Sequence, residues 1–384
     1  MLTFLSIGTD WHKRILKDYI TGENFEKVFL PGIFQTLTNA VEQELKFSKN
    51  NQFPDLFHLV RRIVLRATWD DFVSPLLLKN DPDLLEELMI FQDKVEDATA
   101  KAAVFPRILA LPVCLWPTQK ARGVLRKRLS RTLSSIWDKT DESMGPWLKT
   151  YVKEKTPPAE AAELLIGLVF AAHKNPAIGA SQCICYLKSE MTKMQQEKAL
   201  QEAKYLCSNL SSKSCGKVNL REELLKAKTL RACVLETLRL TAHTIGALRY
   251  AEQPVEVHMT TEESSSKKSH VIPRGETVAL AHHCMHMEPA FWGTDADKFS
   301  LERPEWKSDN PDLGIPVDNY KLTTFSNGIH RCPGERVALA VVEMLVAILI
   351  EMDIQIVGKL APISFERATL AQREGAMPVK FGSS

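Results

Sequence analysis

The sequence contains no apolar run long enough to cross a membrane. A spanning helix needs about 20 consecutive, mainly apolar residues, and no segment of the 384 residues approaches that length. The opening residues Met1–Gly8 are too short for the core of a signal peptide, and no basic residue precedes them. We therefore expect an intracellular chain that is soluble or peripheral as given, and bound to the endoplasmic reticulum membrane if a longer form carries an anchor.

The sequence also has little net charge. Its formal charge of +2 makes neither nucleic acid nor an acidic substrate a favoured partner. A hydrophobic content of 45% with 25% charged residues is typical of a soluble protein with a real core. The length allows one large domain or two ordinary ones, and we interpret residues 1–384 as a single domain that is monomeric.

Cysteine is sparse and scattered. The eight cysteines form no disulfide framework, and Cys183 and Cys185 are too close for a paired zinc knuckle. A reducing compartment is the sensible inference. The neighbouring residues His282, His283 and His286 have no cysteine or carboxylate partners at ligand spacing, so we do not expect them to bind a metal.

Apolar periodicity and boundary residues predict a mainly helical chain with a few strands. The expected helices include Leu30–Phe47, Asp55–Leu78, Asp83–Phe105, Ala121–Asp138 and Ala159–Lys188, with a break at Trp116-Pro117. The expected strands are Val255–Thr261, His270–Ile272, Thr277–Ala281, Ile354–Val357 and Pro378–Phe381. Six basic residues lie within Lys120–Arg131; a solvated helix face is the preferred interpretation, and docking of an acidic redox partner is the alternative.

One cysteine is distinguished by its neighbours. Cys332 precedes the run Val337–Ile350, which is too apolar for a surface helix and should cross the core. Pro333 suits the first position of that helix. A sulfur at a helix start faces free N–H groups and the positive end of the helix dipole, which favour the metal-binding thiolate. Gly328 and Gly334 would let the backbone approach something flat and bulky.

His330 and Arg331 add cationic or donor groups beside that flat object. One thiolate holding a flat group with an anionic edge describes haem with an axial cysteine. A buried structural cysteine would explain Cys332 alone but not its neighbours. The pattern Phe325-x-x-Gly-x-His-x-Cys-x-Gly resembles the haem-binding loop of cytochrome P-450 enzymes.

The resemblance covers nearly the whole chain and is strongest from Leu235 onward. It implies haem b ligated by Cys332, with His330 holding a propionate and Phe325 shielding the sulfur. It also implies a mainly α fold with small β-sheets. The family's N-terminal anchor, first helices and first sheet strands have no counterpart here, so we expect a chain short at its front. The middle helices look most like fungal secondary-metabolism members.

A short motif supports the same resemblance. Glu236 and Arg239 share one helical face, and their apolar neighbours predict a buried pair that needs a further partner. The motif resembles the Glu-x-x-Arg of cytochromes P-450, in which an arginine from a later loop completes the network. Arg303 occupies the matching position, and the implied role of all three is to hold the cysteine loop in place.

Three further residues match family positions that contact the haem propionates. Trp11 and Arg14 lie on an expected N-terminal helix, although their spacing departs from the family's; an amphipathic surface helix explains them equally well. Arg249 matches an arginine that binds a propionate, which suits bidentate Arg–carboxylate pairing. A surface arginine at a strand edge is the alternative for Arg249.

The long helix Ala159–Lys188 is interrupted at His173-Lys174-Asn175-Pro176, where Pro176 must break the helical hydrogen bonding. The resemblance implies that this helix opens over the haem and that Ala172 and Asn175 meet substrate and oxygen. In the family an acidic or amide residue usually precedes a threonine that delivers protons. Here Lys174 and Asn175 stand there, which leaves the reaction type open.

The resemblance therefore implies a haem-thiolate monooxygenase that takes electrons from an NADPH-dependent reductase. Its substrate would be a hydrophobic small molecule of terpenoid, steroid or alkaloid type, in secondary metabolite biosynthesis. An isomerase or dehydratase that acts on a pre-oxidised lipid without a reductase is a second hypothesis. A truncated, non-catalytic paralogue is a third, motivated by the missing front.

Overall fold

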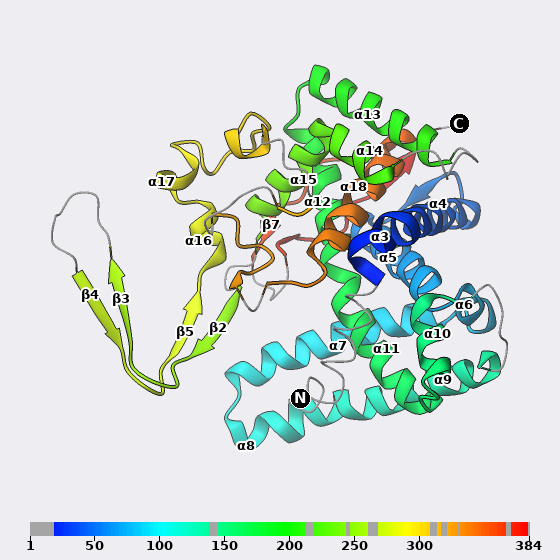
Figure 1. The fold of residues 1–384 in the computed structure, drawn as a ribbon, viewed down its shortest axis with the longest axis horizontal. Coiled ribbons are helices and arrows are strands. Elements are labelled where there is room, and N and C mark those ends of the chain that lie inside the picture. Colours follow the sequence, from blue (N-terminus) through cyan, green and yellow to red (C-terminus); the bar gives the residue numbers. More distant parts are fainter. Residues whose placement is uncertain are drawn as a thin grey trace.

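The computed structural model describes residues 19–137, 144–211, 219–242, 246–259, 268–307, 313–315, 321–328, 331–365 and 370–382. Over these residues the protein is mainly helical with small antiparallel sheets, as the resemblance implied. Figure 1 shows a helical body from which an arm of two antiparallel strand pairs projects. No helix among the described residues is long and apolar enough to cross a membrane.

The first half of the chain is helical. It contains α3 (Gly22–Asn24), a π-helix (Phe25–Phe29), α4 (Leu30–Phe47), α5 (Leu56–Phe72), α6 (Pro75–Asn80), α7 (Leu84–Val104), α8 (Arg107–Leu109), a second π-helix (Ala110–Leu115), α9 (Trp116–Ile136) and α10 (Pro146–Lys153). Sequence predicted one helix where α5 and α6 stand. The helix ends because Ser74 adopts an extended backbone and its side chain accepts the Leu76 N–H, which begins a new helix.

The expected break at Trp116-Pro117 is wrong. Helical backbone runs from α8 through the second π-helix into α9, and Pro117 lies in the first turn of α9. Pro117 has no N–H, so one helical hydrogen bond is missing at this point, but the backbone stays helical on both sides. The basic run on α9 is partly neutralised within the fold, since Arg122 pairs with Glu163 and Arg128 pairs with Asp81.

The second half is built around a buried helix, α18 (Glu335–Glu351), as the apolar run predicted. It packs against α4, α12, α13 and α15. Of these four, α12, α13 and α15 belong to the helices of the second half. The series there is α11 (Pro158–Ala172), α12 (Lys174–Ser189), α13 (Lys193–Ser211), α14 (Leu220–Lys226) and α15 (Lys228–Leu240).

The break in the central helix falls at His173 rather than at Pro176. α11 ends at Ala172 and α12 begins at Lys174, so Pro176 stands in the first turn of α12. The ring of a proline clashes with the carbonyl four residues earlier when the helix is continuous. Ending α11 at Ala172 removes that clash, and the backbone N–H of Ala177 then bonds the carbonyl of His173 at 3.0 Å.

The sheets are small and antiparallel. One has the order β1 (Gln52–Phe53), β9 (Val379–Phe381), β6 (Ile354–Ile356). The three two-stranded sheets are β2 (Ala247–Tyr250) with β5 (Thr277–Leu280), β3 (Val255–Met259) with β4 (Lys268–Ile272), and β7 (Ile363–Ser364) with β8 (Gln372–Arg373). The pairs β2–β5 and β3–β4 form the projecting arm of Figure 1. The expected strands are thus confirmed, each with one bound as predicted and the other one or two residues away.

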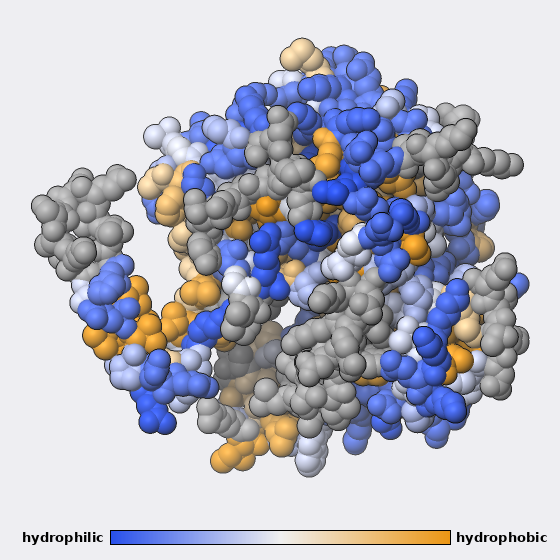
Figure 2. Space-filling model, viewed as in Figure 1, coloured by the Kyte–Doolittle hydropathy of each residue, from blue (hydrophilic) through white to orange (hydrophobic). Residues whose placement is uncertain are grey.

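Short helices connect the arm to the body: α16 (His282–His286), α17 (Pro289–Trp292) and a 3₁₀ helix (Pro304–Lys307). Large apolar side chains are exposed around α8 and the second π-helix, at the lower edge of the helical body in the view of Figure 1. Figure 2 shows apolar surface at that edge, and Ile108 is the most exposed residue of the group, with 87% of its surface exposed. The others in this group are Phe105, Leu109, Leu111, Val113 and Trp116.

Candidate functional site

The structure brings Glu236, Arg239 and Arg303 together in one buried network. Glu236 and Arg239 are fully buried on α15. Arg239 donates from Nε and Nη2 to the two carboxylate oxygens of Glu236, each at 2.8 Å. Arg303 donates from Nε to Glu236 Oε1 at 2.9 Å. The i,i+3 spacing explains the first pair, and the second joins α15 to a loop 67 residues later.

The remaining polar atoms of this Glu236 network also have partners. Arg239 donates to the carbonyls of His286 and Ala296, and Arg303 donates to those of Trp292 and Asp295. Glu236 accepts from the Trp306 indole and the Ser300 N–H as well. A buried ion pair is tolerated only when its hydrogen bonding is complete. The network therefore fixes residues 286–306 against α15.

His286 joins the Glu236 network to the cysteine loop. Its Nδ1 donates to the carbonyl of Arg239 at 2.9 Å, and its Nε2 accepts the backbone N–H of Thr323 at 2.8 Å. Burial lowers the pKa of His286 to about 3, so the ring is neutral, as this donor–acceptor pattern requires. No sequence pattern singles out His286. The only indication is that it falls in residues 285–292, a stretch that the resemblance marks as structural.

The loop that follows presents Cys332. The backbone N–H of Cys332 donates to the carbonyl of Phe325 at 2.8 Å, and the Cys332 side chain is exposed. Ser326 and Gly328 have positive φ angles of 58° and 63°. An added Cβ at Gly328 would meet nothing within 4 Å, so that glycine serves the backbone conformation. At Gly334 an added Cβ would lie 3.9 Å from the Cys332 sulfur, which is an ordinary contact distance. The geometry at these two glycines therefore does not support the expectation that they make room for a flat group.

The expectation that the helix start favours the thiolate is wrong for the free thiol. Removal of water by the surrounding protein raises the pKa of Cys332, the Gly334 N–H lowers it, and Glu335 raises it further. The sulfur is accessible from one side, but the neighbouring protein atoms displace part of its water, and this loss of hydration is the largest effect on the pKa of Cys332. A metal ligand must nevertheless be deprotonated, so iron would expel this proton on binding. Arg331, expected beside the bound group, instead donates to Glu335.

Arg249 lies on β2, half-exposed, and its Nη1 donates to the carbonyl of Leu248 at 3.0 Å. It is close enough to α16 to lower the pKa of His282, although burial is the larger cause of that shift. Because α16 also carries His286, Arg249 and the cysteine loop both adjoin this short helix. Phe325 packs against the core from the loop. Trp11, Arg14 and His330 lie outside the described residues.

The two residues expected over the site lie at the break between α11 and α12. Ala172 ends α11 and is half-buried, and Asn175 is exposed in the first turn of α12. The Asn175 Oδ1 accepts the backbone N–H of Leu370 at 3.4 Å. Lys174 points elsewhere: it is 4% exposed and pairs with Asp93 and Glu96 on α7.

The chemistry of these residues fits a haem. Cys332 offers an accessible sulfur, and Arg249 offers a cation that the described residues bind only through one carbonyl. Buried polar atoms on the loop and on α16 lack partners among the described residues: Asn327 Nδ2, His282 Nδ1 and His283 Nδ1. Buried polar groups are rarely left unpaired without a reason. A soft sulfur ligand and a cation suit iron and a carboxylate respectively.

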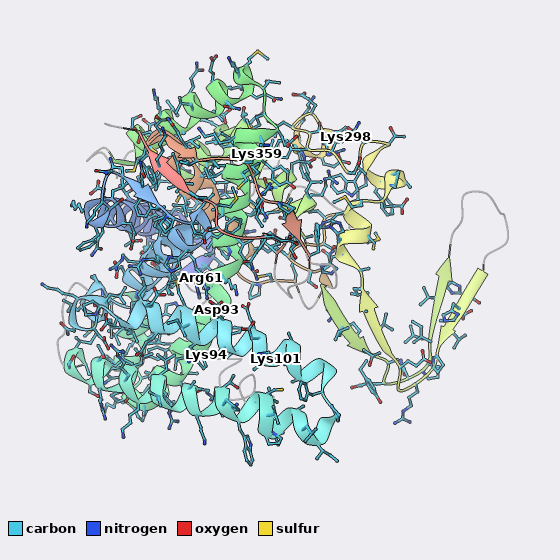
Figure 3. All side chains as sticks on the ribbon, turned by 180° about the vertical axis from the view of Figure 1, so that it is seen from behind. Arg61, Asp93, Lys94, Lys101, Lys298 and Lys359 are labelled. Atoms are coloured by element: carbon cyan, nitrogen blue, oxygen red, sulfur yellow. The ribbon has the colours of Figure 1, made fainter. Side chains whose placement is uncertain are left out.

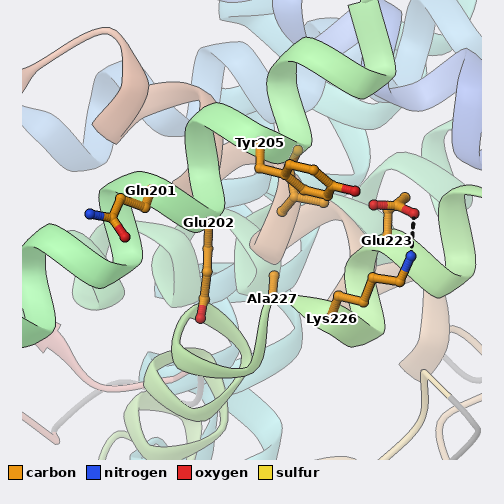
Figure 4. A pocket seen from close by; sticks show the side chains of 7 residues that line it. Gln201, Glu202, Tyr205, Glu223, Lys226 and Ala227 are labelled. Atoms are coloured by element: carbon orange, nitrogen blue, oxygen red, sulfur yellow. Dashed lines mark hydrogen bonds and ion pairs between the residues drawn. The ribbon is translucent and has the colours of Figure 1, made fainter.

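Two other hollows contain none of these residues. One, of about 220 Å³, lies between α13 and α14, where Tyr205 stands beside the ion pair of Glu223 and Lys226 (Figure 4). The other, of about 340 Å³, lies between α7 and the start of α9, with Lys94 and Lys101 at its edge. Neither is the candidate site.

Comparison with known proteins agrees with the site. Residues 182–353 match the family model "Cytochrome P450", and this range contains the Glu236 network and Cys332. Cytochrome P450 monooxygenase pytD of Aspergillus terreus is 34% identical over 143 residues, 34% of this chain and 35% of the relative. Cytochrome P450 714C3 of Oryza sativa is 25% identical over 196 residues, 50% of this chain and 34% of the relative. The matched segments thus span about a third of the length of these relatives.

Proposed function

Because this chain belongs to the cytochrome P450 superfamily, whose members hold haem through a cysteine thiolate, we propose that it is a haem-thiolate monooxygenase with Cys332 as the axial ligand. One observation carries the proposal: the Glu236 network is joined through His286 to the loop that exposes Cys332. In this arrangement a buried network of charged side chains holds in place the loop that carries the cysteine. We include the whole chain, 1–384, in one haem domain.

Each residue has a defined task in this proposal. Cys332 supplies the thiolate, and bound haem would supply oxidation by molecular oxygen and two external electrons. Phe325 keeps water from the inner side of the sulfur, whose electronics depend on such neighbours. Arg249, with His330, Trp11 and Arg14, holds the propionates. Ala172 and Asn175 contact substrate and oxygen from the break in the central helix.

The proposed substrate is a hydrophobic small molecule of terpenoid, steroid or alkaloid type, in secondary metabolite biosynthesis. The relatives support the monooxygenase chemistry only: pytD and a second Aspergillus protein, sphH of Aspergillus fumigatus, are both named as cytochrome P450 monooxygenases. The second is 29% identical over 111 residues, which are 28% of this chain and 20% of the relative. The electron donor in this proposal is an NADPH-dependent reductase. For a longer form that carries an anchor, attachment to the endoplasmic reticulum membrane belongs to the same proposal.

The absorption spectrum of the reduced, haem-loaded protein under carbon monoxide tests this function. We expect a strongly red-shifted Soret band that is lost in Cys332→Ala, because only thiolate ligation produces it. Cys284→Ala is the matched control, since Cys284 is also exposed, and it should keep the band. Failure of the wild-type chain to retain haem, or a band that survives in Cys332→Ala, would refute the proposal.

One observation favours a second candidate, an isomerase or dehydratase acting on a pre-oxidised lipid. Lys174, which stands where the family usually has an acid or amide, is buried in ion pairs with α7. Asn175 follows it and is not a titrating proton donor. A reaction that needs no proton delivery to oxygen would tolerate both. Turnover that requires NADPH and reductase would exclude this candidate.

A further inference from the structure

A cluster of polar side chains ties the break in the central helix to two other helices. We call it the junction cluster; it consists of Arg61 on α5, Gln92, Asp93 and Glu96 on α7, and His173 and Lys174 at the break. In Figure 3 Arg61 and Asp93 lie next to one another, and Lys94 and Lys101 lie farther along α7. The function proposed above assigns no role to these six residues.

The junction cluster satisfies the end of α11. The last carbonyls of a helix have no partners within it. Here His173 Nδ1 donates to the carbonyl of Val169 at 2.6 Å, and Gln92 Nε2 donates to the carbonyl of Phe170 at 3.2 Å. Two of the last four carbonyls of α11 therefore have side-chain partners where the helix stops at Ala172.

His173 has one protonation state in this setting. It is completely buried, and burial lowers its pKa to about 3, so the ring is neutral. Because Nδ1 carries the hydrogen that bonds Val169, Nε2 is the acceptor, and Arg61 Nε donates to it at 3.5 Å. His173 thus bonds the helix on one side and α5 on the other.

The charges of the junction cluster balance. Asp93 accepts from Arg61 at 2.8 and 2.9 Å and from Lys174 at 3.0 Å, and Glu96 accepts from Lys174. Two cations and two carboxylates leave no net charge. Apolar residues of similar size often replace such a set without loss of stability. A gain in folding stability therefore does not account for a buried lysine here. The ion pairs account for it by giving each side chain of the cluster one direction.

The direction of Lys174 determines that of Asn175. Consecutive residues of a helix point about 100° apart, so the first turn of α12 cannot rotate while Lys174 stays bonded to α7. The Asn175 Oδ1 is taken by the Leu370 N–H, which leaves its NH₂ group as the exposed donor. We propose that His173 and Lys174 are positioning residues: their bonds to α5, α7 and α11 hold the Asn175 NH₂ group in the direction in which it would donate to a ligand of a bound haem. This inference rests on the proposed haem-binding function.

The C–O stretching band of the reduced carbon monoxide complex tests this, because a nearby hydrogen-bond donor lowers its frequency. We expect one narrow wild-type band, a higher-frequency band in Asn175→Ala, and a broadened band moved toward that position in Lys174→Met. Lys174→Arg should restore the wild-type band. Lys94→Met is the matched control, because Lys94 is exposed on α7 and forms no ion pair with the described residues.

Hydrogen exchange of the haem-loaded protein provides a second readout. Lys174→Met removes the ion pairs that hold the first turn of α12 to α7, so this turn should open more often. Amides 169–177 should therefore exchange about tenfold or more faster in this variant. Amides of α18 should not change. If Lys174→Met fails to fold, Glu96→Gln, which keeps the side-chain size, takes its place with the same expectations.

Three outcomes would overturn the inference. They are a wild-type C–O band in Asn175→Ala, a wild-type band in Lys174→Met, and unchanged exchange at 169–177. Failure of the proposed function is distinct, since it shows as a missing red-shifted Soret band in the wild-type protein before any of these variants is compared.

Discussion

At the residue scale, most contacts that hold the candidate site join residues far apart in the chain, such as Glu236 with Arg303 and His286 with Thr323. Glu236 and Arg239 could be paired from their i,i+3 spacing, and the resemblance supplied Arg303. No local pattern indicates that Lys174 bonds Asp93 and Glu96, because these acids lie on another helix about 80 residues earlier. His286 was likewise found only once the fold placed its two ring nitrogens between Arg239 and Thr323.

The Glu236→Gln variant should be severely destabilised. It leaves Arg239 and Arg303 buried without their common anion, and breaking such a pair costs about 3–5 kcal/mol. Urea unfolding, followed by far-UV circular dichroism, measures the loss. The exposed Glu252, changed to Gln in the same way, should alter stability by less than about 0.5 kcal/mol. Equal effects of the two changes would contradict the role given to Glu236.

Asp71 should make stability fall as the pH rises. Burial raises its pKa from 3.8 to about 7, against the lowering effect of the Tyr19 hydroxyl, which donates to it at 3.1 Å. Between pH 4 and 7 the folded state therefore binds more protons than the unfolded state, and stability declines at up to about 1.4 kcal/mol per pH unit.

The Asp71→Asn variant should show a flatter profile over that range and greater stability than wild type at pH 8. Unfolding midpoints measured at one-unit pH intervals test this. Asp97→Asn, on an exposed face of α7, should retain the wild-type slope. A slope that survives in Asp71→Asn would mean that another group causes it.

At the element scale, helix existence was predicted better than helix boundaries. The bounds of α4 were predicted correctly because Pro31 stands in its first turn and Ser48, whose backbone is extended, ends it. The division of α5 from α6 depends on one side-chain acceptor, Ser74, and the position of the central break depends on partners from α5 and α7. Partners of this kind lie far away in the sequence, so a local window cannot show them. The strand β1 was not predicted for a different reason, since it has only two residues.

The start of α5 provides a test at this scale. Asp55 accepts the N–H groups of Phe57 and His58, and its Oδ1 also accepts the N–H of Met377 at 3.0 Å. Asp55→Ala removes a helix cap and a contact to the C-terminal strand region together. We expect a loss of about 2 kcal/mol, at the upper end for a cap, measured by urea unfolding. Asp55→Asn keeps an acceptor and should lose less; an equal loss would contradict capping.

At the scale of the whole molecule, the apolar group around Ile108 is the surface feature with the clearest consequence. Monomeric soluble proteins rarely expose a large contiguous apolar patch, and such patches promote association. Ile108→Glu should reduce concentration-dependent self-association, measured by sedimentation velocity, without changing the unfolding midpoint. Val124 on α9 is also exposed but lies outside this group. Val124→Glu should have little effect, and an equal effect would locate the association elsewhere.

The Glu236 network has a consequence for the order in which the chain folds and binds its cofactor. Its bonds close chain segments of up to 70 residues, and closing long segments is slow because their disorder must be lost before the contacts form. The cysteine loop is attached through His286 only after that closure. We therefore expect haem to be captured late, by chains that have nearly finished folding, so that the appearance of the cofactor spectrum during refolding marks the completion of the fold.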